Sequence, residues 1–278
     1  MESLEGSAYR LQPERGAQVV IEDAPLIEWA KTRGIPPSQA VITALERGIL
    51  PVRYLKNRSA LDLSEQLRIC RSRVLICGCG GLGGVLASLL GRAGVGYLRL
   101  VDGDHFAPSN LNRQWFCDAE SLGRNKAEIA RDRIFKINPL LDVAAVPSHF
   151  GDSNAHQILD SVDLVLDALD NLPSRFQLFE SARKLGLPLI HGAVAGWWGQ
   201  VTTFMPGSAA HLDQVYGEHR HRSEAEEGLG VLGPAAALIG SIQSMEALRL
   251  LAGLSPAYAG SLLYYDGESG EQVRVPLS

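Results

Sequence analysis

The sequence of 278 residues has few cysteines and none of the paired spacings that bind structural zinc. Its four cysteines include no C-x-x-C pair, and no cysteine follows Cys117. We therefore expect neither a structural zinc site nor a redox dithiol. Cys77 and Cys79 flank a glycine at the end of an expected strand, and we interpret them as small apolar residues beside a turn.

The chain also lacks a long hydrophobic run and a strong excess of one charge. Its least charged long run, residues 228–245, is too polar and too short to predict a membrane span. The N-terminus has no basic segment followed by an apolar one, so we expect a cytoplasmic protein without a signal peptide. A net charge of −5 argues against a nucleic-acid-coating protein. Basic residues at a functional site would therefore act locally.

Hydrophobic residues at 46% and charged residues at 21% are typical of a globular protein. Apolar spacing, Pro and Gly predict helices over residues 24–33, 36–48 and 59–71. Residues 1–22 have no clear period, and we interpret them as an arm or a short strand. We assign residues 1–52 to an N-terminal helical extension and residues 53–278 to a second unit.

From residue 74 onward, short apolar strands alternate with helices. This alternation predicts a Rossmann-like, doubly wound α/β fold with a mostly parallel sheet and right-handed crossovers. The pattern changes after residue 199 and predicts an antiparallel C-terminal part. Residues 207–228 are polar and without period, which is typical of a functional loop. The expected strands are 74–77, 97–101, 143–146, 164–168, 188–191, 200–204, 261–266 and 272–275, and the expected helices are 82–93, 126–137, 155–159, 173–185 and 234–251.

The strongest local motif is GCGGLG at residues 78–83, directly after the first of these strands. Glycines allow a tight turn there, and backbone N–H groups at the following helix N-terminus attract phosphate. Asp102 ends the next strand, where an acid binds ribose hydroxyls. The motif therefore predicts a nucleotide site that includes Gly78, Gly80, Gly81, Gly83 and Asp102.

A second acid and several polar residues follow this strand. Two interpretations are open for Asp104: it faces Mg²⁺ or its bound water, or it is a turn acid. Asn110, Arg113 and Gln114 lie in the next loop, and the fork of an arginine suits phosphate. Lys126 begins a helix and is equally consistent with a phosphate ligand and with a solvated lysine.

Asp170 and Asn171 follow the strand at 164–168. Because ligands bind at the carboxyl ends of parallel strands, we expect Gly78, Asp102 and Asp170 to converge. His191, at another strand end, would be the proton-transfer residue of an oxidoreductase. We favour a buried core histidine there, and a structural or turn role for Asp167.

Taken in order, these motifs resemble the adenylating domain of the E1-like HesA/MoeB/ThiF family. The resemblance covers about Arg53 to the C-terminus. It rests on GCGGLG (78–83), DGD (102–104), SNLNRQ (109–114), GRNK (123–126), LDALDN (166–171), GWWGQVTTF (196–204) and LYYDG (263–267).

The resemblance implies that ATP lies over the glycine turn with Asp102 on its ribose. Asn110, Arg113 and Lys126 would contact the phosphates, and Asp170 would hold Mg²⁺. The C-terminal carboxylate of a ubiquitin-like sulfur carrier of the ThiS/MoaD type, or of a peptide, would attack the α-phosphate to give an acyl adenylate. Family members are usually homodimers, and the Gly-Gly tail of the carrier runs under a crossover loop that matches residues 207–230 here.

The sequence departs from the family at three places. An arginine that crosses the dimer to the phosphates is replaced by Lys56, with Arg58 as the alternative donor. The zinc-binding cysteine pairs are missing. The crossover loop has the acidic run 224–227 where some relatives have a cysteine, so the expected product is the adenylate itself.

Three alternatives stay open. One is a related E1-like enzyme that activates a small-molecule or tRNA-linked carboxylate, although the acidic net charge disfavours tRNA. Another is a non-catalytic nucleotide-binding scaffold. The third is an NAD-dependent oxidoreductase, which would leave Arg113 and Lys126 without a role.

Overall fold

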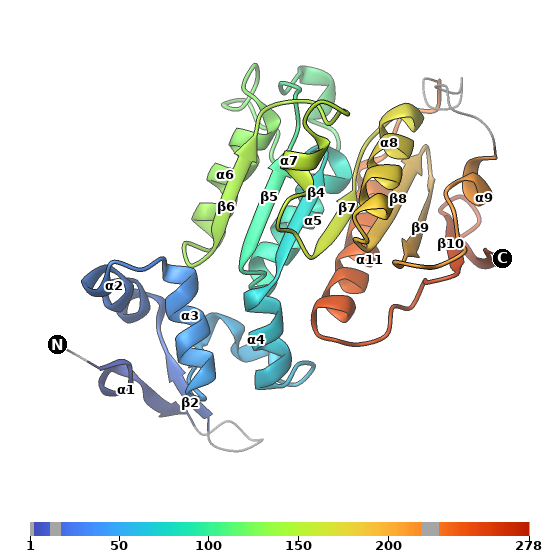
Figure 1. The fold of residues 1–278 in the computed structure, drawn as a ribbon. Coiled ribbons are helices and arrows are strands. Elements are labelled where there is room, and N and C mark those ends of the chain that lie inside the picture. The colour runs from blue at the N-terminus through green and yellow to red at the C-terminus, as the bar shows by residue number, and fades with distance from the viewer. Residues whose placement is uncertain (1–2, 12–17, 218–227, 278) are drawn as a thin grey trace.

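An eight-stranded sheet forms the centre of the molecule, with strand order β11-β10-β9-β8-β7-β4-β5-β6 (Figure 1). The structure is a computed structural model and describes residues 3–11, 18–217 and 228–277. Neighbouring strands are parallel from β6 to β8 and antiparallel from β8 to β11, as predicted. The strands are β4 (Arg73–Cys77), β5 (Tyr97–Val101), β6 (Asp142–Val146), β7 (Leu164–Asp167), β8 (Leu189–Ala195), β9 (Trp198–Phe204), β10 (Ser261–Asp266) and β11 (Glu271–Pro276).

Helices cover both faces of the sheet, which confirms the doubly wound arrangement. On β4, Val74 and Ile76 join one hydrophobic core while Leu75 and Cys77 join another, because successive side chains of a strand point to opposite faces. The first core is completed by α5 (Gly81–Ala93), α6 (Lys126–Ile137) and α11 (Gly233–Leu251), the second by α7 (Ala155–Leu159) and α8 (Leu172–Lys184). Within the described residues, no helix is both long and apolar enough to cross a membrane.

The N-terminal region contains more than the predicted helices. Besides α2 and α3 it has a three-stranded sheet in the order β1-β2-β3. The sequence indicated at most one short strand, within residues 1–22, because strands of two to four residues are too short to show alternation. These elements share a third hydrophobic core. The region comprises α1 (Leu4–Ser7), β1 (Tyr9–Leu11), β2 (Gln18–Ile21), α2 (Asp23–Arg33), α3 (Pro37–Glu46), β3 (Leu50–Pro51), the 3-10 helix η1 (Val52–Asn57) and α4 (Leu63–Arg71).

Some element boundaries differ from the expected ones. Helix α4 begins at Leu63 rather than at residue 59, because Asp62 and Glu65 form a reciprocal capping box there. The fifth parallel strand, β8, continues to Ala195. The stretch expected to be without structure contains the short helix α9 (Asp213–Tyr216). Residues 218–227, which include the acidic run expected in the crossover loop, lie outside the described residues.

Candidate functional site

The turn between β4 and α5 accepts only glycine at two positions. Gly78 has φ +96°, and a Cβ there would lie 2.4 Å from the carbonyl oxygen of Ala168. A Cβ on Gly83 would lie 1.8 Å from the carbonyl oxygen of Gly78. The turn is therefore folded back on itself and pressed against the end of β7. Helix α5 starts behind it with Gly80 at its N-cap, a residue with no side chain to occupy the first N–H groups.

Gln114 lies beside this turn. A Cβ on Gly80 would approach its amide nitrogen to 3.3 Å. The side chain is buried, and its Oε1 has no hydrogen-bond partner among the described residues. A buried amide oxygen without a partner is costly unless a ligand or water satisfies it. The glycine turn and Gln114 together are thus suited to hold a polar group above the N-terminus of α5.

Asp102 links the end of β5 to the glycine turn. Its Oδ2 accepts a hydrogen bond of 2.7 Å from the backbone N–H of Cys79, and its Oδ1 accepts one of 2.8 Å from the N–H of Asp104. Burial raises the pKa of Asp102, and these two N–H donors oppose that effect. The carboxylate that was expected to bind ribose therefore also holds the turn in place.

The structure brings the two ambiguous residues, Asp104 and Lys126, together. Lys126 is buried, and its Nζ lies 3.0 Å from Oδ2 of the half-exposed Asp104. Neither a solvated lysine nor an isolated turn acid describes this pair. Asn125, which the sequence reading left out, caps α6 and donates its Nδ2 to the carbonyls of Asp102 and Asp104 at 3.0 and 3.1 Å.

Asn110 and Arg113 lie in the loop after β5, where Asn110 ends the 3-10 helix η2 (Pro108–Asn110). The buried Asn110 accepts a hydrogen bond of 3.0 Å from the N–H of Ala107. Arg113 donates Nη1 to the carbonyl of Ser109 and to Oδ1 of Asn112, both at 2.9 Å. Asn110 shapes the loop. The guanidinium of Arg113 has only neutral partners in these two hydrogen bonds.

Asp170 and Asn171 connect β7 to α8. Asn171 caps α8 by accepting from the N–H of Ser174 at 3.0 Å, and its Nδ2 donates to Oδ1 of the exposed Asp170 at 3.2 Å. The preceding Ala168 touches Gly78, whose N–H donates to the carbonyl of Val101 at 2.8 Å. The ends of β4, β5 and β7 therefore meet, as the sequence predicted.

Lys56 lies far from the glycine turn. It is exposed on η1, two residues after the buried Tyr54, whose ring lies against Gly94 at the C-terminal end of α5. The glycine turn is at the other end of this 13-residue helix, which spans about 20 Å at 1.5 Å per residue. Lys56 therefore does not reach the glycine turn of its own chain.

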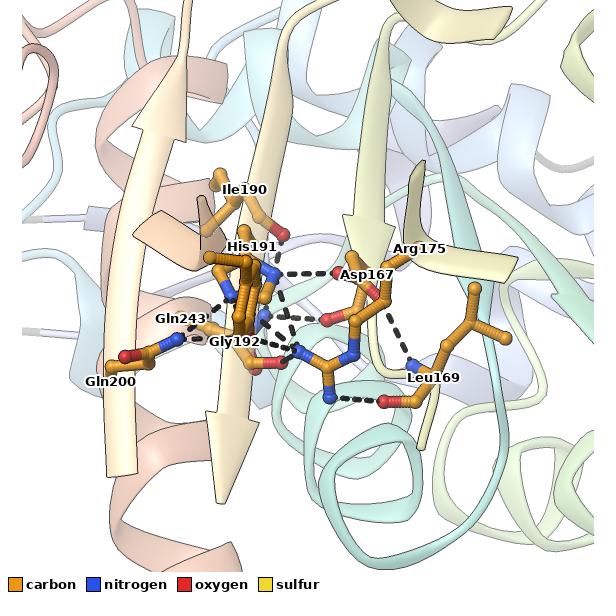
Figure 2. A network of polar contacts seen from close by, with 9 residues as sticks. Asp167, Leu169, Arg175, Ile190, His191, Gly192, Gln200 and Gln243 are labelled. Atoms are coloured by element: carbon orange, nitrogen blue, oxygen red, sulfur yellow. Dashed lines mark hydrogen bonds and ion pairs between the residues drawn. The ribbon is translucent and has the colours of Figure 1, made fainter. Parts of the chain in front are cut away.

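A second polar cluster lies buried where β7 ends beside the middle of β8 (Figure 2). His191 is the third residue of β8 and, contrary to the expectation from the sequence, does not end its strand, because β8 continues to Ala195. His191 donates through Nδ1 to Oδ2 of Asp167 at 2.6 Å, and both side chains are fully buried. The buried Arg175 of α8 donates to the carbonyls of Leu169 and Gly192. His191 is thus a core histidine, as favoured from the sequence. Asp167 is structural.

Charge in this cluster is balanced inside the protein. Burial disfavours the charged form of Asp167, but the Arg175 guanidinium and His191 hold its pKa below the usual value. Burial also lowers the pKa of His191, against the opposing effect of Asp167. The cluster therefore contains a charged aspartate bonded to a neutral histidine, with the Arg175 guanidinium close enough to offset the aspartate's charge. Arg175 was missed in the sequence. Its only signal was a charged residue at a core-facing position of α8.

The sequence matches the ThiF family over residues 54–278. It is 37% identical over 212 residues to the sulfur carrier protein adenylyltransferase of Thermus thermophilus, covering 72% of this chain and 77% of that one. Its identity to the molybdopterin-synthase adenylyltransferase of Escherichia coli is 36% over 209 residues, covering 74% and 83%. For the SAMP-activating enzyme E1 of Haloferax volcanii it is 36% over 203 residues, covering 72% and 75%.

Solved structures share the fold. The crystal structure of E. coli MccB with MccA-N7isoASN superposes with a TM-score of 0.72 at 16% identity, covering 81% of this chain and 72% of that one. The structure of E. coli MccB with ATP gives a TM-score of 0.69 at 16% identity, covering 81% and 71%. At this identity the likeness concerns the fold alone.

Proposed function

The chain belongs to the ThiF family, and we propose that it is an ATP-dependent adenylyltransferase acting on the C-terminal carboxylate of a ubiquitin-like sulfur carrier. The observation that carries this proposal is the meeting of three strand ends. An uncapped helix N-terminus, the cations Arg113 and Lys126, and the exposed carboxylate of Asp170 lie around that point. This set can hold a nucleoside triphosphate, whereas hydride transfer would leave both cations unused.

In the proposed reaction, a carboxylate oxygen of the carrier attacks the α-phosphorus of ATP. The bond from this phosphorus to the bridging oxygen breaks, and pyrophosphate leaves with that electron pair. The α-phosphate lies over the first turn of α5, where backbone N–H groups face it. Arg113 and Lys126 offset the negative charge that develops on the phosphate oxygens, and the glycine turn admits the chain of phosphates without a clash.

Magnesium fits the residues at Asp170. Mg²⁺ usually takes one or two carboxylates together with phosphate oxygens and water, and Asp170 offers one exposed carboxylate next to the glycine turn. Across the described residues, no group of three or more His, Cys, Asp and Glu side chains is arranged to bind a metal ion. We therefore propose that Asp170 holds a Mg²⁺ that enters with ATP and neutralises its phosphates.

Pyrophosphate exchange tests the proposal. Purified protein is incubated with ATP, Mg²⁺, labelled pyrophosphate and a panel of small ubiquitin-like carriers ending in Gly-Gly, with a free peptide, a small carboxylic acid and tRNA as comparisons. Carrier-dependent label in ATP is expected, and Asp170→Ala should lose it. Exchange driven by the small acid or tRNA would favour the related E1-like activities, and ATP binding without any exchange would favour a scaffold. We expect the reaction in the cytoplasm, where ATP is available.

We also propose a homodimer, because Lys56 cannot serve its own site. Exposed apolar side chains lie on the loop after β5, at the N-cap of α11 and along α11, and exposed apolar surface often marks a contact with a partner. A second copy would cover them and bring its Lys56 to the phosphates. These side chains are Leu111, Trp115, Leu232, Leu238 and Met245.

Mixed dimers test this arrangement. Lys56→Ala and Asp170→Ala are each expected to be inactive as homodimers. After mixing and exchange of subunits, the site with intact Asp170 receives an intact Lys56 from its partner, so activity should return to about a quarter of wild type. Absence of recovery in dimers shown to be mixed by mass spectrometry would place Lys56 outside the partner's site. An Arg58→Ala variant mixed in the same way tests the alternative donor.

A further inference from the structure

The hydroxyl group of Tyr216 joins the segment after β9 to the buried cluster of Asp167, Arg175 and His191. Tyr216, the last residue of α9, donates through its hydroxyl to Nε2 of His191 at 3.0 Å. The same oxygen accepts from Arg175 Nη1 at 3.1 Å and from Gln200 Nε2 at 2.9 Å. The ring lies edge-on to those of Phe176 and His191. This hydroxyl adds to the other contacts of the segment, since Leu212 is buried in the second core and His211 Nε2 lies 3.0 Å from Oε1 of Glu180.

The direction of these hydrogen bonds follows from Asp167. Its carboxylate takes the Nδ1 proton of His191 at 2.6 Å, which leaves Nε2 as an acceptor. Because burial lowers the pKa of His191, this neutral form is present at pH 7. Nε2 can then receive the proton of the Tyr216 hydroxyl. Protonated His191 would present an N–H to this oxygen, and the Tyr216 hydroxyl, which already accepts from Arg175 and Gln200, would have to accept there instead of donating.

At its other end, the cluster holds the turn that precedes Asp170. Asp167 Oδ1 accepts from the N–H of Leu169 at 3.0 Å, and Arg175 donates Nη2 to the carbonyl of the same residue. Both backbone groups of Leu169 are therefore engaged by the cluster. Asp170 is the next residue, so its position depends on these two hydrogen bonds.

We propose that Tyr216, through His191 and Arg175, is a positioning residue that couples the segment at 208–217 to the turn bearing Asp170. The inference rests on the proposed function and on the crossover loop expected at 207–230 from the family resemblance, under which the carrier tail would pass. When ATP·Mg²⁺ binds at Asp170, it restricts the motion of the turn that bears this residue. Through the buried cluster, the segment at 208–217 becomes ordered as well. The tail then meets a segment already held in place, so nucleotide binding prepares the site for the carrier.

Hydrogen–deuterium exchange with ATP and Mg²⁺ tests the coupling without any carrier. In the wild type, the nucleotide should slow exchange at both 168–171 and 208–217. In Tyr216→Phe, which keeps the ring and removes the hydroxyl, protection should remain at 168–171 and disappear at 208–217. Tyr97→Phe is the matched control, because that hydroxyl also accepts from an arginine, Arg99 at 3.2 Å, but lies at the start of β5. It should behave as the wild type does.

Wild-type protein that binds ATP without added protection at 208–217, or Tyr216→Phe that keeps this protection, overturns the coupling alone. Wild-type protein that binds no ATP overturns the proposed function and the coupling with it.

With a carrier identified by pyrophosphate exchange, steady-state kinetics gives a second readout. Tyr216→Phe should raise KM for the carrier about tenfold while KM for ATP stays within about twofold, since one hydrogen bond is lost and 1.4 kcal/mol corresponds to a factor of ten. A variant that is merely less stable would lower the active fraction and leave both KM values unchanged. An unchanged KM for the carrier would contradict the coupling.

Discussion

Two polar clusters lie at the carboxyl ends of parallel strands in the same sheet. They differ in whether solvent reaches their charged groups. Around β4 and β5, Lys126 pairs with an Asp104 that is itself half exposed, and Gln114 keeps an acceptor without a partner among the described residues. Around β7 and β8, Asp167 and His191 are completely buried and bonded to each other. The first cluster can exchange its partners for a ligand. The second cluster stabilises the fold only while its groups stay bonded to one another.

This difference follows from where solvent reaches. A charge that can be rehydrated costs little when its partner leaves, whereas a charge in the interior must stay paired. Substitutions in the buried cluster should therefore reduce folding stability, and those in the open cluster should reduce activity. The carboxyl ends of these strands thus combine the proposed reaction site with the buried cluster that supports it.

The largest expected effect is loss of the buried cation. Arg175→Met should lower the free energy of unfolding by about 3–5 kcal/mol, because Asp167 remains buried without its cation. Urea unfolding followed by circular dichroism measures it. Adding Asp167→Asn to Arg175→Met removes the stranded charge and should recover part of the loss. If Arg175→Met alone were as stable as the wild type, the claim that the buried cluster supports folding stability would be wrong.

In the open cluster, Arg113→Ala and Lys126→Ala should each reduce pyrophosphate exchange by about 100-fold or more while the protein stays folded, since each removes a cation aimed at developing phosphate charge. Lys136→Ala, at the exposed last turn of the same helix α6, is the matched control and should retain full activity. Full activity in either site variant would remove that residue from the phosphate site, and unfolding would show that its role is structural.

The smallest effect concerns pH. Because the folded protein holds the pKa of His191 below its ordinary value, the unfolded chain binds this proton first as pH falls. Below about pH 6.5, His191 should therefore reduce stability by up to about 1.4 kcal/mol per pH unit, and above that pH it should have no pH-dependent effect. The lowered pKa of Asp167 adds a further loss only below about pH 4.

Unfolding free energies of wild type and His191→Gln between pH 5 and 8 measure the contribution of His191. The difference between the two proteins should shrink as pH falls below about 6.5. A difference that is constant over this range would mean that His191 titrates alike in the folded and unfolded states, which would contradict its burial as the cause.

Most of the sheet could be predicted because its signals are local. The run of apolar residues in β4 followed by GCGGLG specifies a strand, a turn and a helix within a few residues, and β5, α6 and β10 begin and end where expected. The N-terminal sheet was not predictable in this way, because β2 pairs with strands that are separated from it in the sequence and each strand is short.

The pairing of site residues was less accessible than their identity. Asp104 and Lys126 were both selected from the sequence, but nothing in their spacing indicated that they bond to each other across 22 residues. The core position of Arg175 could not be recognised, because its partners come from β7, β8 and α9. Lys56 was expected to act across a dimer, and its distance from its own glycine turn became visible only in the folded chain.

The sequence by itself determined the succession of strands and helices in the large sheet, the glycine turn, and the acids and cations around it, because each depends on backbone geometry and charge within short segments. Tertiary structure decided which charged and polar side chains face solvent and which are buried. That division depends on how β7, β8, α8 and α9 close over Asp167, His191 and Tyr216, and burial is a property of the packed chain rather than of any segment.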